Sequence, residues 1–323
     1  MGLGIGSWRF FLAFLVVISH LWKDMIGGPA AYAVWGFYVL SGYLMTLVLN
    51  EKYGPSIKGL QRYAYNRFLR IYPLYWIASV FGLLALWMLP PLGVTPSTLN
   101  PAFNIPLTLG DYWHNLTLIP IFGGQNLLTP VSTALATEIG AYILMPFVAF
   151  SRLAAILGLV LSLIANIKLG LTIDDFAMNF ATRYSSFLSC YIAFAFGSLT
   201  YHIRNYLTKL QLPLLSVIIW IIHSFLGVKF NLYPWVYGLY ISIPLSAWVV
   251  VSLLNMNAGK VDRILGDLSY PIYLFHTGIA VWFLLYFNNI RSFKFFIVSF
   301  VITLLISIIM MQLDKKIEQL RKN

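Results

Sequence analysis

Long apolar stretches separated by short polar or basic connections dominate the pattern of this 323-residue chain. A helix needs roughly 17 to 25 mostly apolar residues to cross a bilayer. About ten stretches approach that length, at residues 7–24, 31–49, 70–89, 130–150, 153–167, 184–200, 211–228, 232–254, 269–287 and 294–313. Runs such as FFIVSFVITLLISIIMM are continuously apolar, whereas the strands of a membrane barrel alternate. The pattern predicts an all-α polytopic membrane protein, a bundle of about ten transmembrane helices, with nine or eleven left open by the short stretch at 153–167 and an indistinct boundary near 230.

The composition excludes a soluble globular domain of this size, because 60% of the residues are hydrophobic, 10% are charged and the mean hydropathy is +0.80. Cys190 is the only cysteine, which excludes an internal disulfide and a cysteine-rich metal site. No metal is predicted. The net charge of +11 is compatible with nucleic acid or with anionic lipid, so the distribution of the cations decides between them.

The cations are distributed as the positive-inside rule requires. With the N-terminus in the cytoplasm, 15 of the 21 Lys and Arg residues fall on the cytoplasmic side. This asymmetry predicts an even number of spans with both termini cytoplasmic. It also explains the basic charge through membrane orientation and lipid contact, so no nucleic-acid partner is expected.

Two connections differ from the rest. Residues 50–70 are strongly basic and are predicted to form a cytoplasmic loop. Residues 90–130 contain no Lys or Arg, and their proline, asparagine and aromatic residues predict an extracytoplasmic loop cap of turns and short helices. No fused soluble domain is evident, so residues 1–323 are predicted to form a single integral membrane domain.

Arg9 and His20 lie within the first apolar stretch, eleven residues apart. Eleven residues at about 100° each return to nearly the same helix face, with a rise of roughly 16 Å. An arginine within hydrocarbon costs about 2.5 to 3.5 kcal/mol even on mild insertion scales, so both side chains are expected to face an interior site. The alternative is that Arg9 extends to the cytoplasmic headgroups while His20 is a structural residue of the bundle.

Arg67 and Arg70 have an i, i+3 spacing, which places both guanidinium groups on one helix face just before Pro73. Two neighbouring guanidinium groups bind phosphate well, so a cytoplasmic phosphate-binding site is one interpretation. The alternative is that both residues are ordinary cytoplasmic anchors of the next span.

Five segments in the same order resemble the membrane-bound acyltransferase 3 family, between Trp8 and Thr277. They are WRFFLAFLVVISHLW, WGFYVLSGYLMTLVL, RFLRIYPLYW, ALATEIGAYILMP and LGDLSYPIYLFHT. The resemblance implies an integral membrane O-acyltransferase of the bacterial plasma membrane. Such an enzyme transfers an acyl group, usually acetyl, from cytoplasmic acyl-CoA to a hydroxyl of a cell-surface polysaccharide or lipid-linked glycan.

The family's functional positions fall on particular residues of this chain. Its Arg and His separated by ten residues correspond to Arg9 and His20, and its paired arginines, implicated in acyl-coenzyme A binding, correspond to Arg67 and Arg70. The FxxSGY element contains Ser41, the late element contains Tyr273 and His276, and Glu138 matches the first residue of a glutamate pair whose second position here is Ile139. Ser41, Tyr273 and His276 are expected beside the acetyl-CoA donor; the alternative for His276 is a structural histidine of the helix bundle.

The predicted mechanism has His20 as general base, because a neutral imidazole removes the hydroxyl proton as the thioester is attacked. A covalent acyl-imidazole is an open alternative. Glu138 is predicted to orient His20 or to stabilise its imidazolium, or otherwise to be a structural partner of Arg9 or of a tyrosine hydroxyl. A proton-coupled transporter of glycan precursors also suits buried Arg, His and Glu in a helix bundle, although no inverted repeat is evident. The identity of the acceptor, the acyl chain length and the oligomeric state stay open.

Overall fold

The computed structural model describes residues 4–119, 124–168, 186–230, 232, 235–256 and 259–321. These residues form helices, turns and irregular connections, with no strand among them, which confirms the all-α prediction for this part of the chain. Residues 120–123 of the predicted cap, and residues 184, 185, 233 and 234 of two predicted spans, lie outside the described residues.

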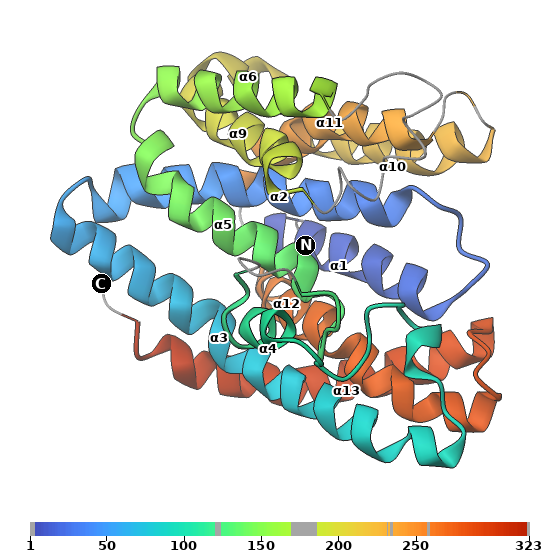
Figure 1. Cartoon of the computed structure of the whole chain (residues 1–323). Helices are drawn as coiled ribbons and strands as arrows, with labels where there is room; N and C mark the ends of the chain where they lie inside the picture. The colour runs from blue at the N-terminus through green and yellow to red at the C-terminus, as the bar shows by residue number, and fades with distance from the viewer. Residues whose placement is uncertain are drawn as a thin grey trace. The chain divides into compact units, whose positions relative to one another are not determined.

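An apolar helix occupies each of the ten predicted stretches (Figure 1). These helices are α1 (Ile5–Leu21), α2 (Pro29–Val48), α3 (Ile57–Met88), α5 (Ser132–Val148), α6 (Arg152–Lys168), α9 (Phe187–Ile203), α10 (Pro213–Lys229), α11 (Trp235–Leu254), α12 (Lys260–Ala280) and α13 (Phe293–Glu318). Within the described ranges, five helical segments are long and apolar enough to cross a membrane, or six if the bent pair Phe187–Leu210 and Pro213–Lys229 is one span. The chain is therefore a multi-pass helical membrane protein, and the count of ten spans stays a prediction.

The basic segment at 50–70 is not a loop along its whole length, because α3 already begins at Ile57. Its residues up to Arg70 include good helix formers such as Leu, Gln, Lys and Arg. Pro73 lies inside α3 and does not end it. A long apolar helix held by its neighbours tolerates the loss of one backbone hydrogen bond, so the proline does not interrupt α3.

The segment between α3 and α5 consists of turns and short helices. It contains the 3₁₀ helices Pro90–Leu92 and Pro96–Thr98, and α4 (Leu109–Thr117). Helix α4 begins with a capping box, in which Thr108 and Asp111 each bond to the other's backbone N–H. Short helices and turns were expected in this segment, whereas the extracytoplasmic cap itself stays a prediction.

The chain divides into two compact units, each built from three segments. The first unit contains Met1–Leu12, Ile26–Tyr63 and Thr137–Arg263; the second contains Ala13–Met25, Ala64–Ala136 and Ile264–Asn323. In the first unit α2 packs against α9 and α11, α6 packs against α9, and α10 packs against α11. Gly42 of α2 meets the backbone of Phe194, and Gly197 of α9 meets that of Val39, so small residues bring these helices close.

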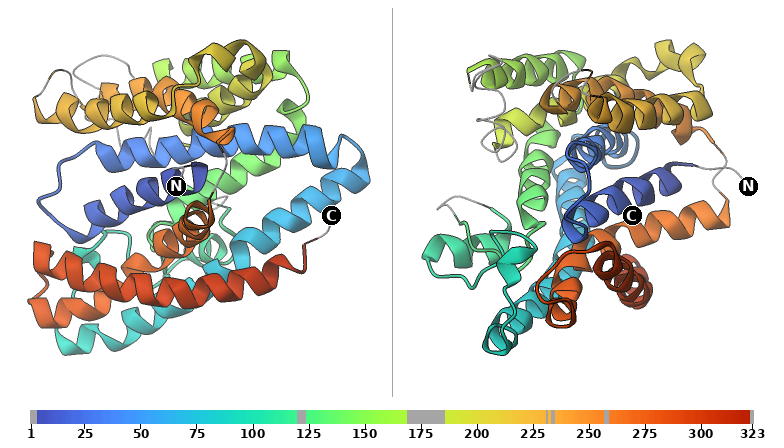
Figure 2. Two further views of the ribbon diagram at one scale, coloured as in Figure 1. Left: turned by 180° about the vertical axis from the view of Figure 1, so that it is seen from behind. Right: turned by 90° about the vertical axis from the view of Figure 1, so that its right-hand side faces the viewer.

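In the second unit, α3 and α13 run in opposite directions (Figure 2). Arg70 of α3 forms an ion pair with Asp314 near the end of α13. At the other end, Asn289 before α13 bonds to the backbone of Gly93 and Thr95 after α3. These contacts fix the register of the two helices.

Candidate active site

Two histidines from distant parts of the sequence meet in the second unit. Nδ1 of His20, in the last turn of α1, lies 2.8 Å from Nε2 of His276 in α12. The two rings are stacked, with an interplanar angle of 18°. His276 is fully buried, whereas His20 is partly exposed. The buried ring of His276 therefore holds the ring of His20 in place through stacking and a hydrogen bond.

The hydrogen bonds determine which nitrogen of each neutral ring carries a proton. Nδ1 of His276 lies 2.7 Å from the carbonyl oxygen of Tyr273, and a carbonyl only accepts, so this nitrogen donates. Nε2 of the neutral ring is then the acceptor, and Nδ1–H of His20 donates to it. Nε2 of His20 is left with its lone pair, as a general base requires.

The backbone of His20 is held in place as well as its ring. Nη1 of Arg291 donates to the carbonyl of His20 at 2.9 Å, and the N–H of Lys23 donates to the carbonyl of Arg291 at 3.0 Å. A guanidinium at the end of a helix pairs with a carbonyl that lacks a partner inside it and complements the helix dipole. No pattern in the sequence indicates this role for Arg291.

In the first unit the carboxylate of Glu138 has two hydroxyl partners. Ser41 of α2 donates to Oε1 of Glu138 at 2.8 Å, and Tyr142, one turn further along α5, donates to the same oxygen. Tyr63 donates to the backbone carbonyl of Tyr142 at 3.2 Å. Glu138 was predicted to orient His20 or to stabilise its imidazolium, or else to be a structural partner of Arg9 or of a tyrosine hydroxyl. The structure shows a tyrosine partner, Tyr142, and adds Ser41. The catalytic role of Glu138 and the contact of Ser41 with the donor stay predictions.

The start of α1, which carries Arg9, is also in the first unit. The carboxylate of Asp262 accepts from the backbone N–H groups of Gly4, Gly6 and Ser7, at 2.8, 3.2 and 2.7 Å. The hydroxyl of Ser7 adds a fourth hydrogen bond at 2.6 Å. A carboxylate at this position satisfies the N–H groups that a helix leaves unpaired at its start. A side chain on Gly6 would overlap the backbone of Asp262, so the close approach requires glycine here.

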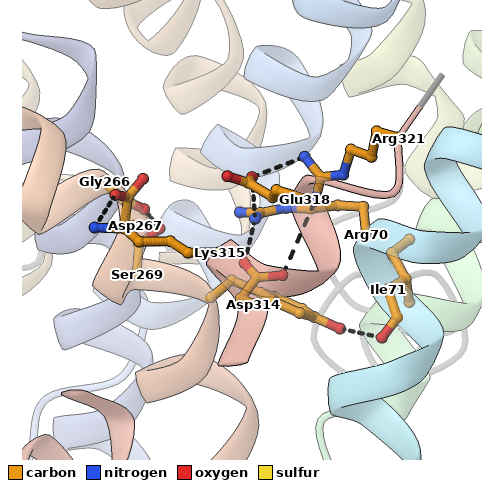
Figure 3. A network of polar contacts seen from close by, with 10 residues as sticks. Arg70, Ile71, Gly266, Asp267, Ser269, Asp314, Lys315, Glu318 and Arg321 are labelled. Atoms are coloured by element: carbon orange, nitrogen blue, oxygen red, sulfur yellow. Dashed lines mark hydrogen bonds and ion pairs between the residues drawn. The ribbon is translucent and has the colours of Figure 1, made fainter. Parts of the chain in front are cut away.

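Arg70 lies in a cluster of charged groups at the end of α13, in the second unit (Figure 3). Its Nη1 is 2.6 Å from Oδ2 of Asp314 and 3.5 Å from Oε1 of Glu318. Arg321 lies 2.7 Å from Glu318 and 3.9 Å from Asp314. The side chain of Asp314 is only 6% exposed. Because Arg70 pairs with Asp314 and Glu318, it is not simply a guanidinium available to phosphate. Neither of these two carboxylates was predicted from the sequence.

Arg67 contributes to the same electrostatic environment. Burial lowers the pKa of Arg321, the nearby guanidinium groups of Arg70 and Arg67 act in the same direction, and Glu318 and Asp314 oppose them. Three guanidinium groups and two carboxylates leave one net positive charge. Throughout the described ranges, no group of three or more His, Cys, Asp or Glu side chains is arranged to hold a metal ion.

Comparison with known families decides the class of protein. The family model for the acyltransferase domain of the acyltransferase 3 type matches residues 3–312. The chain belongs to the acyltransferase 3 family. No curated protein and no solved structure matches the chain.

Membership of the acyltransferase 3 family confirms the resemblance seen in the sequence and supports an acyltransferase enzyme. It gives no support to the transporter alternative. Together with the apolar helices, it indicates a multi-pass membrane enzyme that transfers acyl groups.

Proposed function

We propose that this acyltransferase 3 protein transfers an acetyl group from acyl-CoA to a hydroxyl of a cell-surface polysaccharide or lipid-linked glycan. It acts in the bacterial plasma membrane with both termini in the cytoplasm and needs no metal. The observation that supports this proposal is the hydrogen-bonded series from Tyr273 through His276 to His20. It leaves one nitrogen of His20 ready to accept a proton.

His20 takes the proton of the attacking hydroxyl as the oxygen adds to the thioester carbonyl. The tetrahedral intermediate then collapses, the carbon–sulfur bond breaks, and the proton passes from His20 to the leaving thiolate. His276 is a positioning residue that keeps the lone pair of His20 on the outer nitrogen. Arg9 and Glu138 are proposed to contribute to the same reaction, with Ser41 and Tyr142 holding the carboxylate of Glu138.

The donor's phosphates are proposed to bind at the cluster of Arg67, Arg70 and Arg321. Its one net positive charge supports anion binding, and guanidinium groups suit phosphate oxygens. Tyr273, whose ring lies 6.4 Å from that of His276, is proposed to line the path of the donor's pantetheine arm.

The proposal is tested by acyl transfer in proteoliposomes with acetyl-CoA labelled in the acetyl group, supplied on the cytoplasmic face. The label is expected to appear as an ester on added glycan, and mass spectrometry is expected to show glycan acetyl esters only in cells that produce the protein. Unchanged glycans together with no label transfer by folded protein would overturn the proposal. Transfer from a different thioester would retain the reaction and replace the donor.

Replacing His276 by Leu is expected to lower kcat about five- to tenfold or more, because His20 loses a hydrogen bond worth roughly 1 to 1.5 kcal/mol. His276→Gln supplies a side-chain oxygen that accepts from Nδ1 of His20, so it is expected to recover part of the rate. The measurement is kcat across pH, with the thermal unfolding midpoint of each variant as the structural control. Equal activity of the Leu and Gln variants at equal stability would contradict the orienting role.

A further inference from the structure

Helix α4 has its polar residues inside and its apolar residues outside. Gly110, Asp111, His114 and Asn115 are buried. The exposed side chains are Leu109 (76%), Tyr112 (59%), Leu116 (59%) and Trp113 (37%). A helix between a protein core and water shows the opposite arrangement. The outward face of α4 therefore suits an apolar environment.

The polar groups behind α4 are largely satisfied within the protein. The carboxylate of Asp111 accepts from the backbone N–H groups of Leu107, Thr108, Gln125 and Asn126 and from the side-chain amide of Asn126. The amide of Asn115 bonds to the backbone of Asp111, Asn126 and Leu128. His114 differs, because its buried ring nitrogens have no hydrogen-bond partner among the described residues. Internal pairing of backbone and carboxylate groups is what surroundings without water require.

Three aromatic side chains of α3 close the end of α4. Tyr75, Trp76 and Tyr72 donate to the carbonyls of residues 115, 116 and 117 at 2.9, 3.0 and 2.6 Å. These carbonyls belong to the last turn, where a helix provides no partners of its own. The contacts attach α4 to one level along α3.

That level lies well inside the apolar part of α3. From Ile71 to Met88 the helix carries no charged residue, and Trp76 lies twelve residues before Met88. Twelve residues correspond to about 18 Å along a helix. The end of α4 thus lies far from the end of α3 that leads into the loop (Figure 1). Leu116 adjoins Trp76, which is 39% exposed, so the apolar face of α4 continues the outward surface of α3.

We propose that α4 is a re-entrant membrane helix whose outward face, formed by Leu109, Tyr112, Trp113 and Leu116, contacts the acyl chains of lipids. It replaces the extracytoplasmic cap expected from the sequence at this segment. The surface carries no formal charge, matching hydrocarbon and not headgroups. The proposal does not depend on the reaction that the protein catalyses.

The test is spin labelling of Leu109→Cys and Leu116→Cys in protein reconstituted into phosphatidylcholine vesicles. Collision with oxygen, which concentrates in hydrocarbon, is compared with collision with a water-soluble nickel chelate. Ile309→Cys on α13 is the lipid control and Leu320→Cys beyond it is the water control, each replacing a residue 62% exposed. Cys190 is fully buried, and labelling of the unmodified chain is the blank.

Oxygen accessibility at positions 109 and 116 is expected to exceed nickel accessibility several-fold, as at position 309. Nickel accessibility like that at position 320 would overturn the proposal. A second measurement needs no substitution: unmodified protein is photolysed with an apolar diazirine dissolved in the bilayer and then digested. Labelling of the peptide containing residues 109–116, comparable to labelling within α13, supports the proposal, and its absence with α13 labelled overturns it.

Discussion

Replacement of His20 by Gln is expected to lower the rate of acyl transfer by a factor of about 10² to 10⁴, the usual contribution of a general base. Gln can still donate a hydrogen bond to His276, so the surroundings of the ring are largely kept. It provides no basic nitrogen to take the hydroxyl proton. The measurement is single-turnover transfer of labelled acetyl groups at saturating donor, which separates chemistry from donor binding.

His223→Gln is the matched control for this prediction. His223 lies in α10, bonds to the carbonyl of Gly238 at 2.9 Å and stacks on Tyr32. It is a buried imidazole in an apolar helix, as His276 is, but it has no proposed part in the reaction. The control variant is expected to keep its transfer rate. A His20→Gln variant as active as this control would remove the general base from the proposed mechanism.

The positions of the helices could be predicted from the sequence, because each apolar stretch by itself indicates a helix. The expected first stretch at 7–24 and the observed α1 at Ile5–Leu21 differ by two or three residues at each end. Helix ends depend on local capping, and the caps of α1 come from Asp262 and Arg291, far away in sequence. The residues around a helix end do not indicate capping partners that are far away in the sequence.

The residues of the site could also be predicted from the sequence, whereas the contacts between them could not. The sequence singled out both His20 and His276, yet 256 positions separate them, and their hydrogen bond follows only from the packing of α1 against α12. Asp314 escaped notice because a carboxylate near the end of a terminal helix looks like an ordinary interfacial residue. Pairing of intramembrane charges is a general expectation, but choosing the partner requires the fold.

Replacing Arg70 by Met is expected to destabilise the protein by about 3 to 5 kcal/mol, because it leaves the buried carboxylate of Asp314 without its close cation. Arg321, at 3.9 Å from Asp314, compensates only in part. The measurement is the free energy of unfolding in mixed detergent micelles. Lys316→Met, which removes a cation of α13 with no ion pair recorded among the described residues, is the control and is expected to change stability little.

The double variant Arg70→Met with Asp314→Leu separates the structural role of Arg70 from binding of the donor. Removing both charges leaves no uncompensated carboxylate, so most of the stability is expected to return. If the guanidinium also binds the phosphates of acyl-CoA, activity does not return with stability, and KM for the donor stays raised about tenfold or more, the loss of one charge-assisted hydrogen bond of roughly 1.5 to 3 kcal/mol. A double variant with normal stability and normal KM would assign Arg70 to the α3–α13 contact alone and place donor recognition elsewhere.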